Sequence, residues 1–134
     1  MTERRHPTHR MTVTSIDDLV IFVGARAPDG AAVEWLEREV LAARARDGAR
    51  RGGYIHCVLA ARDTDGNIDE HTRKAMLHFV KACTPKYVAG AVVLEQAGFV
   101  GAAVRSVISA VLLAARPEIP VKMFATSGEA GAWL

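Results

Sequence analysis

The chain has 134 residues, of which 50% are hydrophobic and 24% are charged. This composition excludes a chain that is disordered as a whole, and the length fits one domain that can build its own core. The net charge of +2 excludes a strong general attraction to nucleic acids or to anionic membranes. The two cysteines, Cys57 and Cys83, follow no metal-binding spacing and cannot form a disulfide framework, so the sequence indicates a reduced, cytoplasmic setting.

Residues 1–10 predict a flexible basic tail. They are polar, they include Arg4, Arg5 and Arg10, and they lack the apolar stretch of a secretory signal. A single domain is then expected over residues 11–134.

Two strands and a helix are expected in the first part of this domain. Residues 11–15 can form a short edge strand, and the β-branched and aromatic run at 19–23 predicts a strong strand. A helix follows and ends near Arg46. Its inward face is predicted from the apolar residues at helical spacing, namely Val33, Leu36, Val40 and Ala43.

The middle of the chain predicts a strand over 54–61 and a second amphipathic helix over 69–83. The apolar stripe of this helix consists of Met76, Phe79, Val80 and Cys83. Pro85 should end the helix, because the residue before a proline is pushed out of helical geometry.

The last third predicts a buried strand over 87–95, a glycine turn over 96–101 and a very apolar helix over 102–116. A strand over 121–125 and a short terminal helix capped by Ser127 complete the chain. The order β(β)αβαβαβα predicts an α/β fold with a mixed, mainly parallel sheet of four to five strands.

The polar loop at 63–70 is the first candidate for chemistry, because its alternating oxygen ligands suit calcium. The pattern departs from a calcium loop at Ile68, where glycine is needed, and at Lys74, where a bidentate glutamate is needed. A solvated turn leading into a helix is the favoured interpretation, and we expect no metal site.

Other polar groups give no catalytic pattern. The turn Gly98 to Gly101 could cradle an anion, but a tight connection between strand and helix explains it better. His56 and Cys57 are adjacent in a strand and point to opposite faces. His71 and His78 lie two helical turns apart and form no pair.

We therefore expect no cofactor and no enzyme. An enzyme using Glu95 or His78 is the least supported alternative, because no acid and base stand at motif spacing. The arginine group at 44–51 could touch phosphate or an acidic protein. A solvated helix end is favoured there, and no aromatic residues interleave it as in nucleic-acid binders.

The order of elements resembles the STAS fold, the family of anti-sigma factor antagonists with SpoIIAA-like and SEC14-like relatives. The sequence of residues 92–107 and 121–134 is similar in its general pattern to the C-terminal half of small bacterial proteins of that type. In regulatory STAS proteins a serine or threonine after an aspartate, following a strand, is phosphorylated by a partner kinase. The resemblance therefore implies a phospho-acceptor region at Asp63 and Thr64.

The helix over 99–116 carries the functional hypothesis. On a helical wheel Arg105, Ser109 and Arg116 fall in one narrow sector, and the remaining arc is too apolar for one sheet face to cover. These residues and Ser106 also interrupt the helix, so we expect no membrane insertion. The predicted interface consists of Phe99, Val100, Ala103, Val104, Val107, Ile108 and Val111.

We thus expect a non-catalytic interaction module, regulatory or scaffolding, that binds another protein or itself as a homodimer. The alternative is a small-molecule or lipid-binding carrier of SEC14-like type, in which the same helix forms the wall of a pocket.

Overall fold

A computed structural model of the chain describes residues 1–7, 11–24, 29–46, 53–58, 68–95 and 98–134, with the backbone alone for 53–58. Everything said below about the structure concerns these ranges.

A single six-stranded sheet organises the described chain, and its strands lie side by side in sequence order. The strands are β1 (Thr2–Arg5), β2 (Met11–Ile16), β3 (Leu19–Gly24), β4 (Gly53–Val58), β5 (Ala89–Leu94) and β6 (Val121–Phe124). The first three pair antiparallel, whereas β3 to β6 pair parallel. The predicted α/β class with a mixed, mainly parallel sheet is confirmed.

The prediction of a flexible tail over residues 1–10 is wrong for residues 2–5. The prediction of four to five strands is wrong for the same reason, because these residues add a sixth strand to the sheet. These residues form β1, in which Thr2 pairs with Ser15 and Arg5 with Thr12. All four side chains are exposed, so the strand carries no apolar alternation that the sequence could reveal. Charged side chains on an edge strand are a common protection against further strand pairing.

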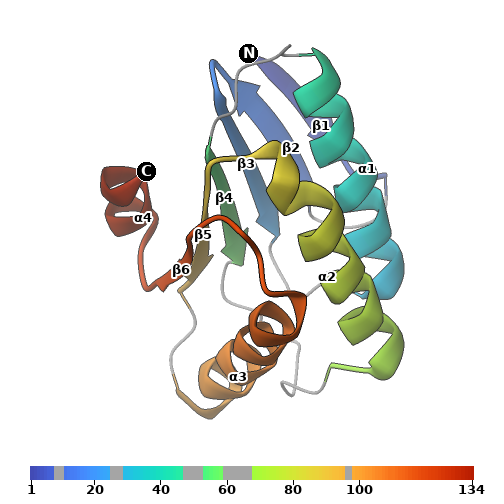
Figure 1. Ribbon diagram of the computed structural model, residues 1–134, viewed down its shortest axis with the longest axis vertical. Helices are drawn as coiled ribbons and strands as arrows, with labels where there is room; N and C mark the ends of the chain where they lie inside the picture. Colours follow the sequence, from blue (N-terminus) through green and yellow to red (C-terminus); the bar gives the residue numbers. More distant parts are fainter. Residues whose placement is uncertain (8–10, 25–28, 47–52, 59–67, 96–97) are drawn as a thin grey trace.

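Three helices connect the parallel strands and a fourth ends the chain. They are α1 (Gly30–Arg46), α2 (Glu70–Cys83), α3 (Gly98–Ala115) and α4 (Ser127–Trp133). The helix α2 ends at Cys83 as Pro85 predicts, and a 3-10 turn, η1 (Thr84–Lys86), follows it. In Figure 1, α1 and α2 lie side by side on one side of the sheet, α3 lies below them, and α4 lies on the other side.

The alternation of side chains along the strands explains this layering. On one face Phe22 joins α1 and α2 in the main core, and Val92 packs with α3. On the opposite face Val93 packs with Ala130 of α4. Consecutive parallel strands with crossovers of one hand place their connecting helices on one face, which leaves the other face to the terminal helix.

The ends of the helices are fixed by side-chain caps. The Asp29 carboxylate accepts the N–H of Ala32 at 2.8 Å at the start of α1. At α4 the hydroxyl of Thr126 accepts the N–H of Glu129 at 3.2 Å, so the cap is Thr126 and the expectation of Ser127 was one residue late.

The core between α1, α2 and the sheet is closely packed. The inward face predicted for α1 is confirmed, since Leu36 and Val40 are at most 2% exposed. Phe22 of β3 meets Phe79 of α2 edge to face, with ring centroids 5.6 Å apart. Packing of this kind excludes water and supplies most of the stability of a small domain.

One arginine is part of this core. Arg44, in the last turn of α1, is 7% exposed, and its guanidinium lies 5.4 Å from the centre of the buried Tyr87 ring. Its Nη1 and Nη2 atoms are buried without a hydrogen-bond partner. We expected the arginines at the end of α1 to be solvated. Arg46 is exposed as expected, whereas the expectation is wrong for the buried Arg44.

Candidate functional site

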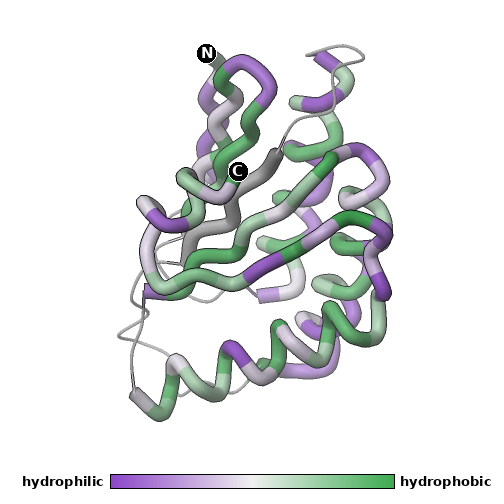
Figure 2. Tube along the Cα trace, turned by 60° about the vertical axis from the view of Figure 1, so that its left-hand side comes forward, coloured by the Kyte–Doolittle hydropathy of each residue, from purple (hydrophilic) through white to green (hydrophobic). Residues whose placement is uncertain are grey.

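The helix α3 is the most exposed apolar element of the described chain. It has 18 residues, is the one described helix whose length and composition would allow it to cross a membrane, and is 22% buried. Figure 2 shows it along the lower edge of the molecule, with hydrophobic residues over most of its length. One side of this helix packs against β5, as the core helix of a folded domain does.

The helix packs inward through one narrow side. Val104, Ile108 and Val111 are at most 9% exposed, and the first two contact the β5 residues Val92 and Leu94 within one cluster. Arg105 is half-buried beside this contact and donates to the carbonyl oxygen of Leu94 at 3.4 Å.

The seven residues predicted as an interface divide into three groups. Val104, Ile108 and Val111 belong to the core of the protein and are not available to a partner. Val100, Ala103 and Val107 are half-buried. Of the seven, Phe99 is the residue that lies in solvent, at 84% exposure.

The opposite side of α3 holds residues that the sequence reasoning did not select. Leu113 is 78% exposed, and its neighbours along this side are small. We define the outer face of α3 by its exposed residues Phe99, Ala102, Ser106, Ser109 and Leu113. The spacing of these residues was visible in the sequence, but only the contacts of α3 show which side meets the fold.

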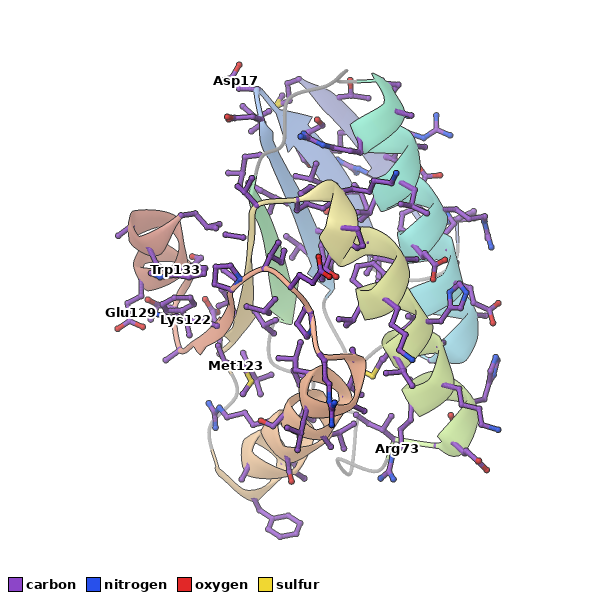
Figure 3. The ribbon with its side chains drawn as sticks, viewed as in Figure 1. Asp17, Arg73, Lys122, Met123, Glu129 and Trp133 are labelled. Carbon is purple, nitrogen blue, oxygen red and sulfur yellow. The ribbon has the colours of Figure 1, made fainter. Side chains whose placement is uncertain are left out.

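A groove runs between α2 and α3, with a volume of about 410 Å³. We call it the α2–α3 groove. Its lining from α2 is Arg73, Lys74 and Leu77, and its lining from α3 is Ser106, Val107, Ala110, Val111 and Ala114. Arg73 projects from α2 toward α3 in Figure 3. The groove thus combines an apolar wall with two cations at one side.

The predicted chemical sites fall outside this region. Asp63 and Thr64 lie outside the described residues. No group of three potential metal ligands occurs among the described residues. Glu95 is exposed after β5. His71 and His78 each approach a glutamate of α1, and neither lines the α2–α3 groove.

The histidine contacts tie α2 to α1. His71 Nε2 lies 3.1 Å from Glu34 Oε1, and His78 Nδ1 lies 2.8 Å from Glu37 Oε2. Both histidines are at least 65% exposed, so these are surface contacts between two helices rather than buried acid–base pairs.

The described thiol is also unsuited to chemistry. Burial, with a smaller contribution from the charge of Glu37, raises the pKa of Cys83 to about 12. A thiol with this pKa carries almost no thiolate at neutral pH and is a poor nucleophile. The exposed side of α3 with its groove is therefore the candidate site for binding.

Comparison with known proteins gives information about the fold and not about the function. No protein-family model matches the chain, and no curated protein matches it in sequence. Among solved structures, the chain is similar to the NMR structure of the protein TM1081, with a TM-score of 0.51 and 14% sequence identity. The similarity covers 98% of this chain and 92% of that one, so it extends over the whole α/β domain.

Proposed function

We propose that this protein is a non-catalytic, cytoplasmic interaction module of STAS-like architecture, regulatory or scaffolding, that binds a second copy of itself through the outer face of α3. One observation carries the proposal. An 18-residue apolar helix is 22% buried, and two of its large side chains, Phe99 and Leu113, are 84% and 78% exposed. Exposed apolar surface of this kind marks interaction sites in soluble proteins.

The outer face is complementary to itself. Phe99 and Leu113 lie on the same side of α3 and are separated by roughly 21 Å along its axis. The residues between them, Ala102, Ser106 and Ser109, are small. In an antiparallel pair of α3 helices around a two-fold axis, Phe99 of each copy meets Leu113 of the other, and the small residues let the backbones approach.

The STAS part of the proposal rests on the order of elements and on the sheet, in which the parallel strands follow one another in sequence order. The similarity to TM1081 is compatible with it at the level of the fold. The proposal extends to Asp63 and Thr64 as the phospho-acceptor region, where phosphorylation regulates binding to another protein.

Sedimentation equilibrium of the purified protein tests self-association. We expect a dimer for the wild type and a monomer for Leu113→Glu, because a carboxylate placed against Phe99 of the other copy would lose its water without gaining a partner. The matched control is Val88→Glu. Val88 is 51% exposed and lies outside α3, so this variant should remain dimeric.

Two outcomes contradict the proposal. One is a wild-type protein that stays monomeric at the highest concentration it tolerates. The other is a dimer that Leu113→Glu leaves intact while circular dichroism shows both proteins folded, since the contact would then lie elsewhere.

A further inference from the structure

We propose that the α2–α3 groove binds the acyl chain of an anionic amphiphile, a fatty carboxylate, with its head group at Arg73 and Lys74. This site shares Ser106 with the outer face of α3, but the rest of its lining lies elsewhere, and it does not depend on self-association. Its volume of about 410 Å³ falls within the range typical of small-ligand sites.

The walls of the groove suit a hydrocarbon chain. Leu77 of α2 faces Val107 and Val111 of α3, and all three are buried or half-buried. Ala110 and Ala114 border the same space, are exposed, and leave room because their side chains are single methyl groups. An apolar chain placed there would remove these surfaces from water, which is favourable in proportion to the area covered.

The shape of the groove also favours a chain over a compact ligand. Its α3 wall runs from Ser106 to Ala114, which corresponds to roughly 12 Å along a helix axis. The α2 wall is shorter and ends in its two cations, Arg73 and Lys74. A linear molecule with one charged end therefore matches both the length and the polarity of the groove.

The charges at the groove select the sign of the head group. Lys74 is within 3.2 Å of Glu70, but both side chains are at least 75% exposed, so this ion pair is weak and can rearrange. Arg73 has no ion pair with any described residue and can offer a planar, two-pronged donor to a carboxylate. The pair of cations attracts an anionic head and repels a cationic one.

Titration of the ¹⁵N-labelled full chain with decanoate, below its micelle concentration, tests the proposal by NMR. We expect saturable shifts confined to the amides of residues 73–77 and 106–114. Decyltrimethylammonium, which has the same tail and the opposite charge, should bind at least about tenfold more weakly. Acetate, which has the head without the tail, should cause no saturable shift.

Two pairs of variants separate the parts of the site. Ala110→Phe should fill the groove and weaken decanoate binding about tenfold or more, whereas Val88→Phe, at an exposed position outside the groove and outside α3, should leave it unchanged. Arg73→Gln combined with Lys74→Gln should weaken it about five- to tenfold. Lys81→Gln, which removes a cation of α2 outside the groove, should have no effect. Ala114→Phe replaces Ala110→Phe if the latter does not fold.

The proposal is overturned if decanoate gives no saturable shift, if the cationic amphiphile binds equally well, or if the shifts map elsewhere. Binding of an acidic amphipathic peptide in the groove, without binding of decanoate, would also overturn it and assign the groove to a protein partner. Failure here leaves the dimer test untouched, because sedimentation of the protein without decanoate measures self-association and not ligand binding.

Discussion

The helices α1 and α3 make the most instructive comparison in the molecule. They have 17 and 18 residues, and each connects two neighbouring parallel strands across the same face of the sheet. Seven residues of α1 are buried, whereas four of α3 are buried. The helix that is more apolar is therefore the one that its own fold covers less.

The difference lies in what the two helices present outward. The exposed side of α1 is charged, and its Glu34 and Glu37 contact the histidines of α2. The exposed side of α3 carries alanine, serine, Phe99 and Leu113. A helix designed only to cover a sheet can be polar outside, as α1 is. The apolar outside of α3 indicates a second contact beyond its own sheet.

The largest expected effect compares one leucine from each helix. Leu36→Ala should lower the free energy of unfolding by about 3 kcal/mol, because Leu36 is 2% exposed and its removal leaves a cavity. Leu113→Ala should change it by less than about 0.5 kcal/mol, because Leu113 is 78% exposed. Urea unfolding monitored by circular dichroism measures both values.

The concentration of protein is the control for this comparison. Both measurements belong at the lowest usable concentration, where the linkage between dimerisation and stability is smallest. The Leu113→Ala variant should lose stability relative to the wild type only as the concentration rises. A loss of several kcal/mol at low concentration would mean that Leu113 is buried within the monomer.

The sequence predicted much of this fold because the strongest patterns coincide with the deepest burial. Val33, Leu36 and Val40 recur at helical spacing and do form the inward face of α1. Pro85 ends α2 where expected. These features depend on local geometry and on one apolar face, both of which are written directly in the residue order.

The interface on α3 could not be located in the same way. A helix that is apolar around most of its circumference has no pattern that says which side meets the sheet. Val104, Ile108 and Val111 were predicted as part of the interface, but the fold buries all three against its own core. Phe99 and Leu113 remain exposed together with the alanine and serine residues between them, because contacts with β5 and α2 determine which side of α3 is covered.

The buried arginine of α1 gives a second, smaller test of the comparison. Arg44→Met should raise the free energy of unfolding by about 1 kcal/mol, because it replaces a buried guanidinium that lacks hydrogen bonds at Nη1 and Nη2 with an apolar chain. The loss of the contact with the Tyr87 ring offsets part of this gain. Thermal unfolding of the variant measures the net change.

Arg46→Met is the matched control for Arg44→Met, since Arg46 lies in the same turn and is exposed. It should leave the free energy of unfolding unchanged within about 0.5 kcal/mol. If Arg44→Met instead clearly lowers the free energy of unfolding, the guanidinium has a hydrogen-bond partner in the folded protein in solution. Water would then reach the inward face of α1 near Arg44.

The smallest expected effect concerns the start of α2, the helix that stands between α1 and α3. The Asp69 carboxylate accepts the N–H of Thr72 at 2.8 Å. Hydrogen bonds from Thr72 lower the pKa of Asp69 below its ordinary value of 3.8. A lowered pKa in the folded state means that the ionised carboxylate stabilises the protein above about pH 3.8, and that this contribution is lost as the pH falls through the folded-state pKa.

Asp69→Asn keeps a side-chain oxygen that can cap the helix but removes the titration. Its urea midpoint at neutral pH should be slightly lower than that of the wild type, and the two midpoints should converge below pH 3.8. The first turns of α2 hold His71, which contacts α1, and Arg73, which lines the groove toward α3. Loss of the cap should therefore increase amide exchange on both sides of α2 together. Amide exchange confined to the α1 side would show that α2 is anchored by α1 alone, and that its contact with α3 is independent of this turn.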